Sequence, residues 1–410
     1  MRSPKIRFKG YSEDWEQRKL GELADKVTEK NGRLQYIETF TNSAEFGIIS
    51  QRDFFDHDIA KIGSLDGYYI VRNEDFVYNP RISTSAPVGP INRNKLGRIG
   101  VMSPLYTVFR PHDVDTTYLE HFFKSKYWHS FMNYNGDSGA RSDRFSIKDS
   151  VFFEMPIPIP QIEEQRKIGE HLTQLDHLIT LHQRKCEQTQ KLKKYMLQKM
   201  FPQDKTNVPK IRFDGFTDAW EQRKLGEITE LKSASRVHKD EWTSNGVPFY
   251  RSSDVMAAIN GTENEKAFIS EELYEKLSKV SGKLEEGDIL VTGGGSVGNP
   301  YIVPDNKPLY TKDADLLWIK NKGKFHPYFL YEFFFSPTFR NYLGSISHVG
   351  TIAHYTITQL SETPICLPSF EEQKEVGEYF QSLDHLITLH QQKCDQLQSI
   401  KKYMLQNMFV

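Results

Sequence analysis

The chain has 410 residues, more than one ordinary hydrophobic core accommodates, so we expect two or more domains. Its content of 38% hydrophobic and 26% charged residues, with 27 Phe, excludes the disordered and low-complexity classes. A formal net charge of −1 excludes nucleic-acid binding through overall charge and leaves only local basic patches. Three cysteines give no disulfide framework, the first residues are too polar for a signal peptide, and no run approaches the roughly 18 apolar residues of a membrane span. These features predict a folded, cytoplasmic protein without membrane association.

The opening segment of the chain occurs a second time. PKIRFKGYSEDWEQRKLGE at 4–22 returns as PKIRFDGFTDAWEQRKLGE at 209–227, identical at 14 of 19 positions. A longer segment at 156–201 returns at 364–409, and both copies contain the nonapeptide LDHLITLHQ. Repetition on this scale predicts two tandem copies of one structural unit.

The first variable segment, residues 23–155, contains a basic stretch. Residues 81–110 carry five Arg and Lys side chains and no Asp or Glu. Cations among Ser, Thr and Asn are typical of a surface that faces phosphates and base edges, although a solvated loop has the same composition. A glycine-rich stretch at 136–146 adds two arginines. The candidate DNA-binding residues of this segment are Arg52, Arg81, Ser83, Thr84, Arg93, Arg98, Arg141 and Arg144.

A long helix is predicted after each boundary at 156 and 364. From Glu163 to about Met200 there is no proline, and residues that suit a helix–helix contact recur with spacings of 4, 3, 4 and 3. About 38 residues at ~1.5 Å rise give a helix of roughly 57 Å. The second copy keeps the spacing, and Ser369 with Glu372 forms the sequence signature of a capping box. The predicted seam consists of Leu172, Leu175, Ile179, His182 and Cys186 in the first helix and Phe380, Leu383, Ile387, His390 and Cys394 in the second.

Neither helix can bury its seam alone, so the simplest partner of each is the other. A pseudo-twofold axis between tandem copies would pack them antiparallel, with the variable segments at opposite ends of a rigid spacer. The predicted fold class is therefore α+β, with two globular α/β domains and a long antiparallel two-helix coiled coil. The predicted domain boundaries are 1–155, 156–203, 204–363 and 364–410.

Two histidines and two cysteines of the seam suggest a metal site, because H-x3-C occurs in both helices. Zinc sites normally use short Cys/His pairs on loops or turns, whereas these residues lie in helix interiors at contact positions. We therefore expect mid-sized seam residues and no metal.

The second variable segment, residues 228–363, differs strongly from the first. Its polar loops are VTGGGSVGNP at 291–300 and SHVGTIAHYT at 347–356. Short polar side chains on loops can approach base edges, and Arg can bind guanine in a bidentate manner. The candidates here are Arg251, Ser252, Ser253, Thr292, Gly293, Ser296, His348 and Thr351.

Two short motifs invite a catalytic or cofactor interpretation. Gly293, Gly295 and Gly298 spell G-x-G-x-x-G, but a strand-like segment and not a helix follows, so a tight turn is favoured over a dinucleotide loop. NPRI at 79–82 lacks the second proline and the aromatic residue of the N-P-P-aromatic motif of amino-methyltransferases, and a loop is predicted. No nucleophile–base pair, metal cluster or phosphate loop is recognisable in either copy, so we expect no catalytic residues.

Taken together, the paired F-x-G-F/Y-x-x-x-W-E-Q-R-K-L-G-E openings, the paired P-I-x-x-P-x-x-E-E-Q boundaries and the long helices after them resemble the specificity subunit of type I DNA restriction-modification systems. The resemblance spans nearly the whole chain. It implies that each variable segment is a target recognition domain for one half of a bipartite double-stranded DNA site, and that the helices set the gap. It also implies docking of two methyltransferase subunits that use S-adenosylmethionine, joined by two ATP- and Mg-dependent restriction/translocase subunits. This chain would hold no cofactor.

Two other functions remain open at this point. The chain could be a self-contained DNA methyltransferase or nuclease with unrecognised catalytic residues, or a coiled-coil scaffold that binds proteins. The DNA sequence recognised and the length of the gap do not follow from the amino-acid sequence, because recognition also depends on loop geometry and DNA shape.

Overall fold

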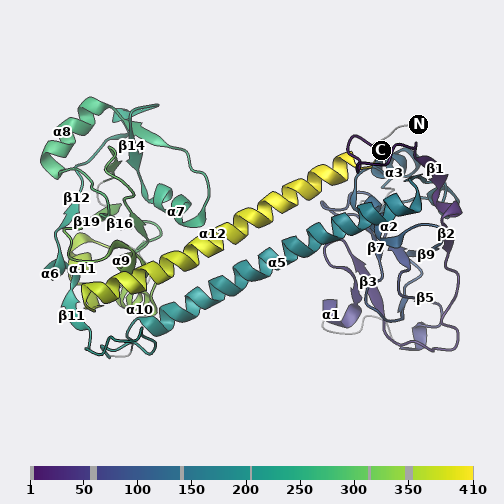
Figure 1. Ribbon diagram of the computed structural model, residues 1–410, viewed down its shortest axis with the longest axis horizontal. Helices are drawn as coiled ribbons and strands as arrows, with labels where there is room; N and C mark the ends of the chain where they lie inside the picture. Colours follow the sequence, from purple (N-terminus) through teal and green to yellow (C-terminus); the bar gives the residue numbers. More distant parts are fainter. Residues whose placement is uncertain are drawn as a thin grey trace. The chain divides into compact units, whose positions relative to one another are not determined.

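The computed structural model describes residues 4–55, 62–138, 143–203, 206–312, 315–346 and 354–409. The chain divides into two compact units: unit 1 is Met1–Gln183 with Gln392–Val410, and unit 2 is Arg184–Gln391. Each unit mixes helices with mainly antiparallel sheets, as Figure 1 shows, which confirms the α+β class. Each unit also takes in part of both long helices, whereas the sequence-based boundaries treat each long helix as a separate segment.

Unit 1 is built around a four-stranded antiparallel sheet of order β2-β9-β6-β7, with two-stranded sheets β3-β4, β5-β8 and β1-β10. The buried aromatic side chains of this sheet and of α2 form its main core. Its elements are β1 (Glu16–Lys19), η1 (Leu20–Glu22), β2 (Ala24–Lys26), β3 (Phe40–Ser43), β4 (Gly47–Ser50), α1 (Gln51–Phe55), η2 (Ile62–Ser64), β5 (Tyr69–Val71), β6 (Phe76–Tyr78), β7 (Ile91–Arg93), β8 (Gly100–Met102), β9 (Thr107–Pro111), α2 (Thr116–Lys124), α3 (His129–Asn135), α4 (Asp149–Phe152), β10 (Pro156–Ile159) and the first part of α5 (Ile162–Met200).

Unit 2 has two four-stranded sheets, β12-β19-β16-β17 and β13-β15-β14-β18, and the two-stranded sheet β11-β20. The sheets of the two units thus differ, as do the sequences of the two variable segments. Its elements are β11 (Glu221–Lys224), α6 (Leu225–Ile228), β12 (Leu231–Ser233), η3 (Lys239–Glu241), β13 (Trp242–Thr243), β14 (Val247–Tyr250), α7 (Ser252–Asn260), β15 (Ala267–Ile269), α8 (Glu271–Ser281), β16 (Ile289–Thr292), β17 (Pro300–Ile302), β18 (Tyr310–Thr311), β19 (Leu316–Ile319), α9 (Pro327–Phe333), α10 (Pro337–Ile346), α11 (Ile357–Ser361), β20 (Pro364–Leu367) and part of α12 (Phe370–Asn407).

The repeated segments pair with each other inside each unit. The opening strand β1 runs antiparallel to the boundary strand β10, with Glu16 opposite Ile159 and Lys19 opposite Pro156. In unit 2, β11 pairs with β20 in the same way. The two conserved parts of each repeat therefore form one structural joint.

A buried carboxylate fastens this joint. Glu164 near the start of α5 accepts hydrogen bonds from Arg7 Nε at 2.7 Å, Arg7 Nη2 at 2.9 Å and Trp15 Nε1 at 3.2 Å. Glu372 in α12 accepts the same set from Arg212, at 2.6 and 2.7 Å, and from Trp220 at 3.2 Å. The repeated E-E-Q boundary thus supplies the acceptor of this contact, and the repeated opening supplies its donors.

The predicted capping box of α12 forms only in part. Ser369 Oγ accepts a hydrogen bond from the backbone N–H of Glu372 at 3.3 Å, as predicted. The carboxylate of Glu372, which the box would turn back onto residue 369, instead binds Arg212 and Trp220. Burial explains the difference, because a buried carboxylate is stabilised more by a bidentate guanidinium than by one backbone amide.

The long helices pack antiparallel within each unit. In unit 1, Lys401 donates a hydrogen bond to Asp176, and the apolar side chains of both helices share one core. In unit 2, Lys193 Nζ lies 2.6 Å from Asp384, and Cys186 Sγ lies 3.8 Å from Ile387 O. The structure buries Leu172, Leu175, Ile179, Cys186, Phe380, Leu383 and Cys394 and half-buries His182, Ile387 and His390.

Each long helix carries a glycine where a second helix crosses it. A Cβ atom at Gly377 would lie 2.5 Å from His326 Nδ1 and 3.0 Å from Phe329 N, at the start of α9. A Cβ atom at Gly169 would lie 3.0 Å from Tyr118 N in α2. Glycine is required at both positions because the backbones approach closely.

The variant Gly377→Ala is expected to lower the free energy of unfolding of unit 2 by about 1–3 kcal/mol, since the added methyl group overpacks the crossing. Gly344→Ala in α10 is the matched control, because nothing lies within 4 Å of its Cβ position and alanine favours helix. Urea unfolding of both variants measures the difference, and equal stabilities would contradict the close-approach explanation.

No helix in the described ranges is long and apolar enough to cross a membrane. Within the same ranges, no group of three or more His, Cys, Asp or Glu side chains is placed to hold a metal ion.

Candidate nucleic-acid interface

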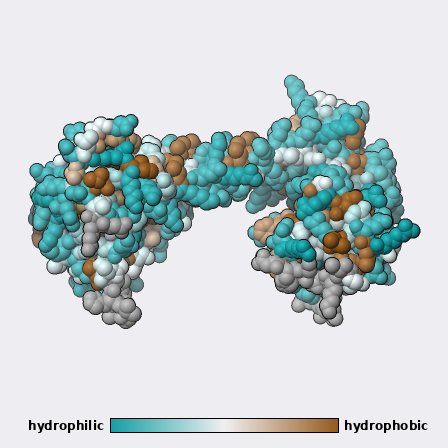
Figure 2. All heavy atoms as spheres, turned by 90° about the horizontal axis from the view of Figure 1, so that it is seen from below, coloured by the Kyte–Doolittle hydropathy of each residue, from teal (hydrophilic) through white to brown (hydrophobic). Residues whose placement is uncertain are grey.

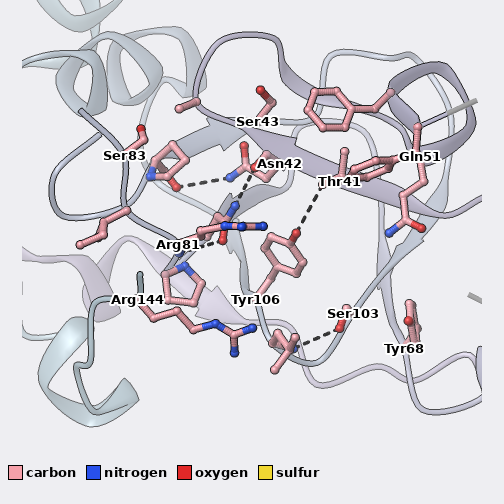
Figure 3. Close-up of a pocket in the computed structure, with 18 residues that line it drawn as sticks. Thr41, Asn42, Ser43, Gln51, Tyr68, Arg81, Ser83, Ser103, Tyr106 and Arg144 are labelled. Atoms are coloured by element: carbon pink, nitrogen blue, oxygen red, sulfur yellow. Dashed lines mark hydrogen bonds between the residues drawn. The ribbon is translucent and has the colours of Figure 1, made fainter. Parts of the chain in front are cut away.

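A cleft of about 520 Å³ opens in unit 1 beside the β3–β4 hairpin. Figure 3 shows polar side chains from the hairpin, from the segment after β6 and from the loop before β9 facing one another across it. Its polar lining consists of Thr41, Asn42, Ser43, Gln51, Tyr68, Asn79, Arg81, Ser83, Ser103, Tyr106 and Arg144. The predicted NPRI loop forms one side of this cleft.

Two arginines lie next to each other along the cleft. Arg81 and Arg144 are antiparallel bridge partners, and Ile82 N donates to Asp143 O at 3.0 Å beside them. Within the described part of the chain neither guanidinium forms an ion pair. Backbone pairing therefore holds two uncompensated positive charges together, an arrangement that favours an anionic partner such as a phosphodiester.

The asparagines of the cleft form hydrogen bonds with neighbouring segments of unit 1. Asn42 Nδ2 donates to Val77 O at 2.7 Å, and its Oδ1 accepts from Asn92 Nδ2 at 2.7 Å. Asn79 Nδ2 donates to Asn42 O at 2.8 Å. These bonds fix the shape of the cleft and join the hairpin to β6 and β7.

Two other predicted arginines of unit 1 are held in ion pairs. The nearly buried Arg93 lies 2.6 Å from Glu120 and 2.9 Å from Glu74, so its charge is compensated inside the unit. Arg98 binds Glu38 at 2.8 Å, and these hydrogen bonds raise the pKa of its guanidinium. Both arginines stabilise the fold, and their role in DNA binding stays a prediction.

The remaining predicted residues of unit 1 lie at the surface. Arg52 is exposed on α1, and Thr84 is exposed in the turn that follows Arg81. Ser83 lines the cleft, with its Oγ 3.1 Å from Ser85 Oγ. Arg141 lies outside the described residues.

In unit 2 the predicted side chains at the start of α7 form hydrogen bonds within the unit. Arg251 Nε donates to Asp254 at 2.9 Å, and its guanidinium lies 5.6 Å from the ring centre of Trp242. Ser252 Oγ donates to Asp315 O at 3.0 Å, and Ser253 Oγ accepts from an asparagine at 3.0 Å. These side chains therefore have fewer free hydrogen-bonding groups than the sequence suggests.

The glycine-rich segment of unit 2 is the turn of the β16–β17 hairpin. No helix follows it, which confirms the predicted turn, and Gly295 and Gly298 have φ of 73° and 74°. Thr292 is buried, and Gly293 N donates to Asp315 O at 2.7 Å. Of the predicted residues only Ser296 is exposed at its tip, while His348 and Thr351 lie outside the described residues.

Sequence reasoning missed the residue that supports this turn. Arg340 in α10 donates to Asn299 Oδ1 at 3.0 Å and to Val297 O at 3.4 Å. Its guanidinium packs over Phe335 and Phe339, and burial lowers its pKa. The sequence contains no local signal for this contact, because Arg340 lies in a helix far from the turn along the chain.

Gln51 and Tyr106 in the unit 1 cleft were also missed. Gln51 directly follows β4, within the segment GIISQRDFF, which lies at a similar place in the first repeat to PFYRSSDVM in the second and shares only Asp53 with its Asp254. Comparison of these segments position by position is the signal that could have singled out Gln51, because Ser252 stands at its place.

The family model described as the type I restriction modification DNA specificity domain matches residues 12–191 and again 217–399. The chain belongs to this family. The two matches cover both repeats, so the resemblance found in the sequence is confirmed.

Relatives of the specificity family match over nearly full length. The type I restriction enzyme MjaVIII specificity subunit of Methanocaldococcus jannaschii is 24% identical, over 96% of this chain and 91% of its own. A putative type I restriction enzyme specificity subunit of Haemophilus influenzae is 23% identical, over 87% of this chain and 80% of its own. The crystal structure of the type I S subunit from M. genitalium superposes with a TM-score of 0.59 at 15% identity, covering 100% of this chain and 99% of that chain, which supports the fold.

For a specificity subunit, the two cleft arginines that form no ion pair within the described residues should contribute to DNA affinity. The double variant Arg81→Ala and Arg144→Ala is expected to weaken binding and to reduce the slope of log K against log salt by about 1 per lost phosphate contact. Arg72→Ala is the control, because that guanidinium is already bound to Glu29 and Arg72 is not among the predicted DNA-binding residues. Binding assays at several salt concentrations measure the slope, and equal slopes for both variants would contradict this assignment.

Proposed function

We propose that this specificity subunit recognises a bipartite double-stranded DNA site in the cytoplasm, with unit 1 and unit 2 each recognising one half. The long helices would set the gap between the halves and dock two methyltransferase subunits, joined by two restriction/translocase subunits. S-adenosylmethionine, ATP and Mg belong to those partners in this proposal, and this chain contributes recognition without a catalytic centre.

The observation that carries the proposal is a duplicated set of exposed apolar side chains on the long helices. In unit 1 the set is Leu178, Leu181, Ile400 and Tyr403, and in unit 2 it is Leu386, Leu389, Leu192 and Tyr195. Figure 2 shows apolar atoms at intervals along the helices among hydrophilic ones. Each member of one set has its repeat equivalent in the other, as docking of two copies of one partner requires.

Helix geometry supports a single docking face within each unit. Leu178 directly precedes the seam residue Ile179, and Ile400 directly precedes Lys401 at the equivalent seam position. In an antiparallel pair these flanking positions lie on the same side of the seam. Residues three positions later along each helix share that side, which adds Leu181 and Tyr403. Exposed apolar patches of this kind mark protein–protein contacts.

The differences between the units support recognition of two different half-sites. The strand–helix junction after β4 carries Gln51, whereas the junction after β14 carries Ser252. The joints made by Glu164 and Glu372 are the same in both units. A conserved framework with different polar surfaces fits one partner that binds twice and two DNA sequences that each bind once.

Helix length supports the proposed gap. The 39 residues of α5 correspond to about 58 Å at ~1.5 Å per residue. Half-sites one turn of DNA apart are separated by roughly 34 Å, which a helix pair of this length can span after overlap with the globular parts.

Exchange of the variable segment 23–155 for that of another member of the family tests the proposal. The complex assembled with methyltransferase subunits and methyl donor is incubated with DNA, and the methylated sites are mapped. We expect one half-site to change and the other to remain. One extra heptad in each long helix is expected to lengthen the gap by about three base pairs, since seven residues add roughly 10 Å.

Two results would contradict the proposal. Methyl transfer to DNA by the purified chain alone would indicate an enzyme with its own catalytic site. A heptad insertion that changed the bases of a half-site and left the gap unchanged would exclude the spacer role of the helices.

A further inference from the structure

Gln51 at the end of the unit 1 cleft has an unused hydrogen-bond acceptor. The residue is only 7% exposed, and within the described part of the chain its Oε1 atom has no hydrogen-bond partner. Figure 3 shows its side chain hanging from α1 beside Thr41 and directed toward Tyr68 across the cleft. A buried acceptor without a donor costs about 1–3 kcal/mol, so a group that supplies an N–H here would relieve a real penalty.

The orientation of the carboxamide is fixed by its other bond. Nε2 donates to Phe40 O at 3.3 Å, and a carbonyl oxygen can only accept. The oxygen of the carboxamide must therefore point the other way. A ligand in the cleft must therefore present a hydrogen-bond donor, and not an acceptor, to Gln51 Oε1.

Exposed aromatic rings border the same cleft. Phe54 is 42% exposed and Phe55 is 37% exposed, with their ring centres 4.6 Å apart in an edge-to-face arrangement. Aromatic rings at a surface are platforms on which an unstacked nucleobase can pack. The cleft thus combines an apolar platform with a buried acceptor that has no partner within the described residues.

Size and charge agree with a nucleotide. A volume of about 520 Å³ lies within the roughly 300–1,000 Å³ of pockets that enclose small molecules or groups. Arg81 and Arg144, which form no ion pair within the described residues, supply positive charge on the same cleft. A base in the cleft would therefore have cations close to its own backbone phosphates.

We propose that this cleft takes one nucleobase extruded from the DNA, whose N–H donor binds Gln51 Oε1 and whose ring packs on the phenylalanines. A paired adenine or cytosine presents one amino N–H in the major groove, but Gln51 is only 7% exposed, so a base has to leave the stack to bring an N–H to it. The inference rests on the proposed DNA recognition by unit 1 and adds a specificity-determining residue to it.

Unit 2 does not repeat this acceptor at the matching position. Ser252, which begins α7 as Gln51 begins α1, donates its hydroxyl to Asp315 O. The extruded base is accordingly assigned to the half-site of unit 1 alone.

Methylation mapping of the assembled complex with Gln51→Met tests the assignment. Methionine has a similar shape but only a weakly accepting thioether, so the preference for the correct base is expected to fall about ten-fold at one position of one half-site. Gln222→Met, the same change at an exposed residue of β11, is the control and should leave both half-sites unchanged. An unaltered motif in Gln51→Met overturns the inference while the bipartite motif itself still supports the proposed function.

Extrusion is tested with duplexes in which the base at that position stands opposite an abasic residue. Removal of the pairing partner lowers the cost of extrusion, so the wild-type complex should bind several-fold more tightly, and Gln51→Met should gain less. Weaker or unchanged binding would indicate recognition of an intact base pair and overturn the proposal. A further experiment offers free nucleoside monophosphates at millimolar concentration to the complex without DNA. If they bind, and if Gln51→Met abolishes that binding, the cleft is a small-molecule site, and its assignment to DNA is overturned.

Discussion

Replacement of Glu372 by alanine is expected to lower the free energy of unfolding of unit 2 by about 3–5 kcal/mol. The carboxylate is buried and holds the Arg212 guanidinium through two hydrogen bonds and the Trp220 indole through a third. Its removal leaves a largely buried cation and a buried indole N–H without acceptors. The loss therefore exceeds the net value of the intact contact, because the remaining groups stay desolvated.

Glu371→Ala is the matched control for this variant. Glu371 is exposed in the first turn of α12, where a carboxylate contributes only about 0.3–1 kcal/mol through the helix dipole. Urea unfolding of both variants, followed by circular dichroism, measures the difference in stability. Equal effects of the two variants would show that Glu372 does not fasten the joint.

The double variant Leu386→Glu and Leu389→Glu is expected to reduce the methyltransferase subunits bound per chain from two to one. Burial of each leucine at an interface contributes about 1.5–3 kcal/mol, so loss of both weakens docking by about a hundred-fold or more. The equivalent leucines of unit 1, Leu178 and Leu181, remain and should still hold one partner. Native mass spectrometry of the assembled complex counts the subunits.

His385→Glu controls for the added charge, because His385 is exposed on α12 two positions from the seam residue Leu383. It should retain two partners, and the variant with all four leucines replaced should retain none. Two partners bound by the Leu386→Glu and Leu389→Glu variant would exclude this face as the docking surface. The variable segments 23–155 and 228–363 are untouched in every variant, so retained affinity for DNA verifies their folding.

The framework of the fold could be predicted because the repeated segments and the helical spacing are directly visible in the sequence. The spacing of the long helices anticipates the buried positions from Leu172 to Cys186, since burial along a helix follows a regular period. The partners of Glu164 and Glu372 could not be predicted, because contacts between segments about 150 residues apart leave no local pattern.

The candidate interface was predicted less completely. Arg81 and Arg144 do line one cleft, but Arg93 and Arg251 are held by nearby carboxylates. Arg93 in the basic stretch acquires its acidic neighbour Glu120 only through folding, so local composition overstates its availability, whereas the partner of Arg251, Asp254, is three residues away in the sequence. Gln51 was missed for the opposite reason, since a single neutral amide has no compositional signal.

The pairing of β1 with β10 has a consequence for how such chains diversify. Lys19 and Pro156 lie opposite each other in one antiparallel ladder, so the two ends of the intervening segment are neighbours in space. The β1–β10 ladder acts as a fixed stem, and the segment between its two strands is inserted into this stem. Because the ends of the segment are already neighbours, its length and topology can change without disturbing the stem. The two stems of this chain already carry different sheets. Recombination within the repeated gene segments that encode the stems would therefore exchange whole recognition modules in frame with their anchoring contacts, and new target sequences could arise in single genetic events.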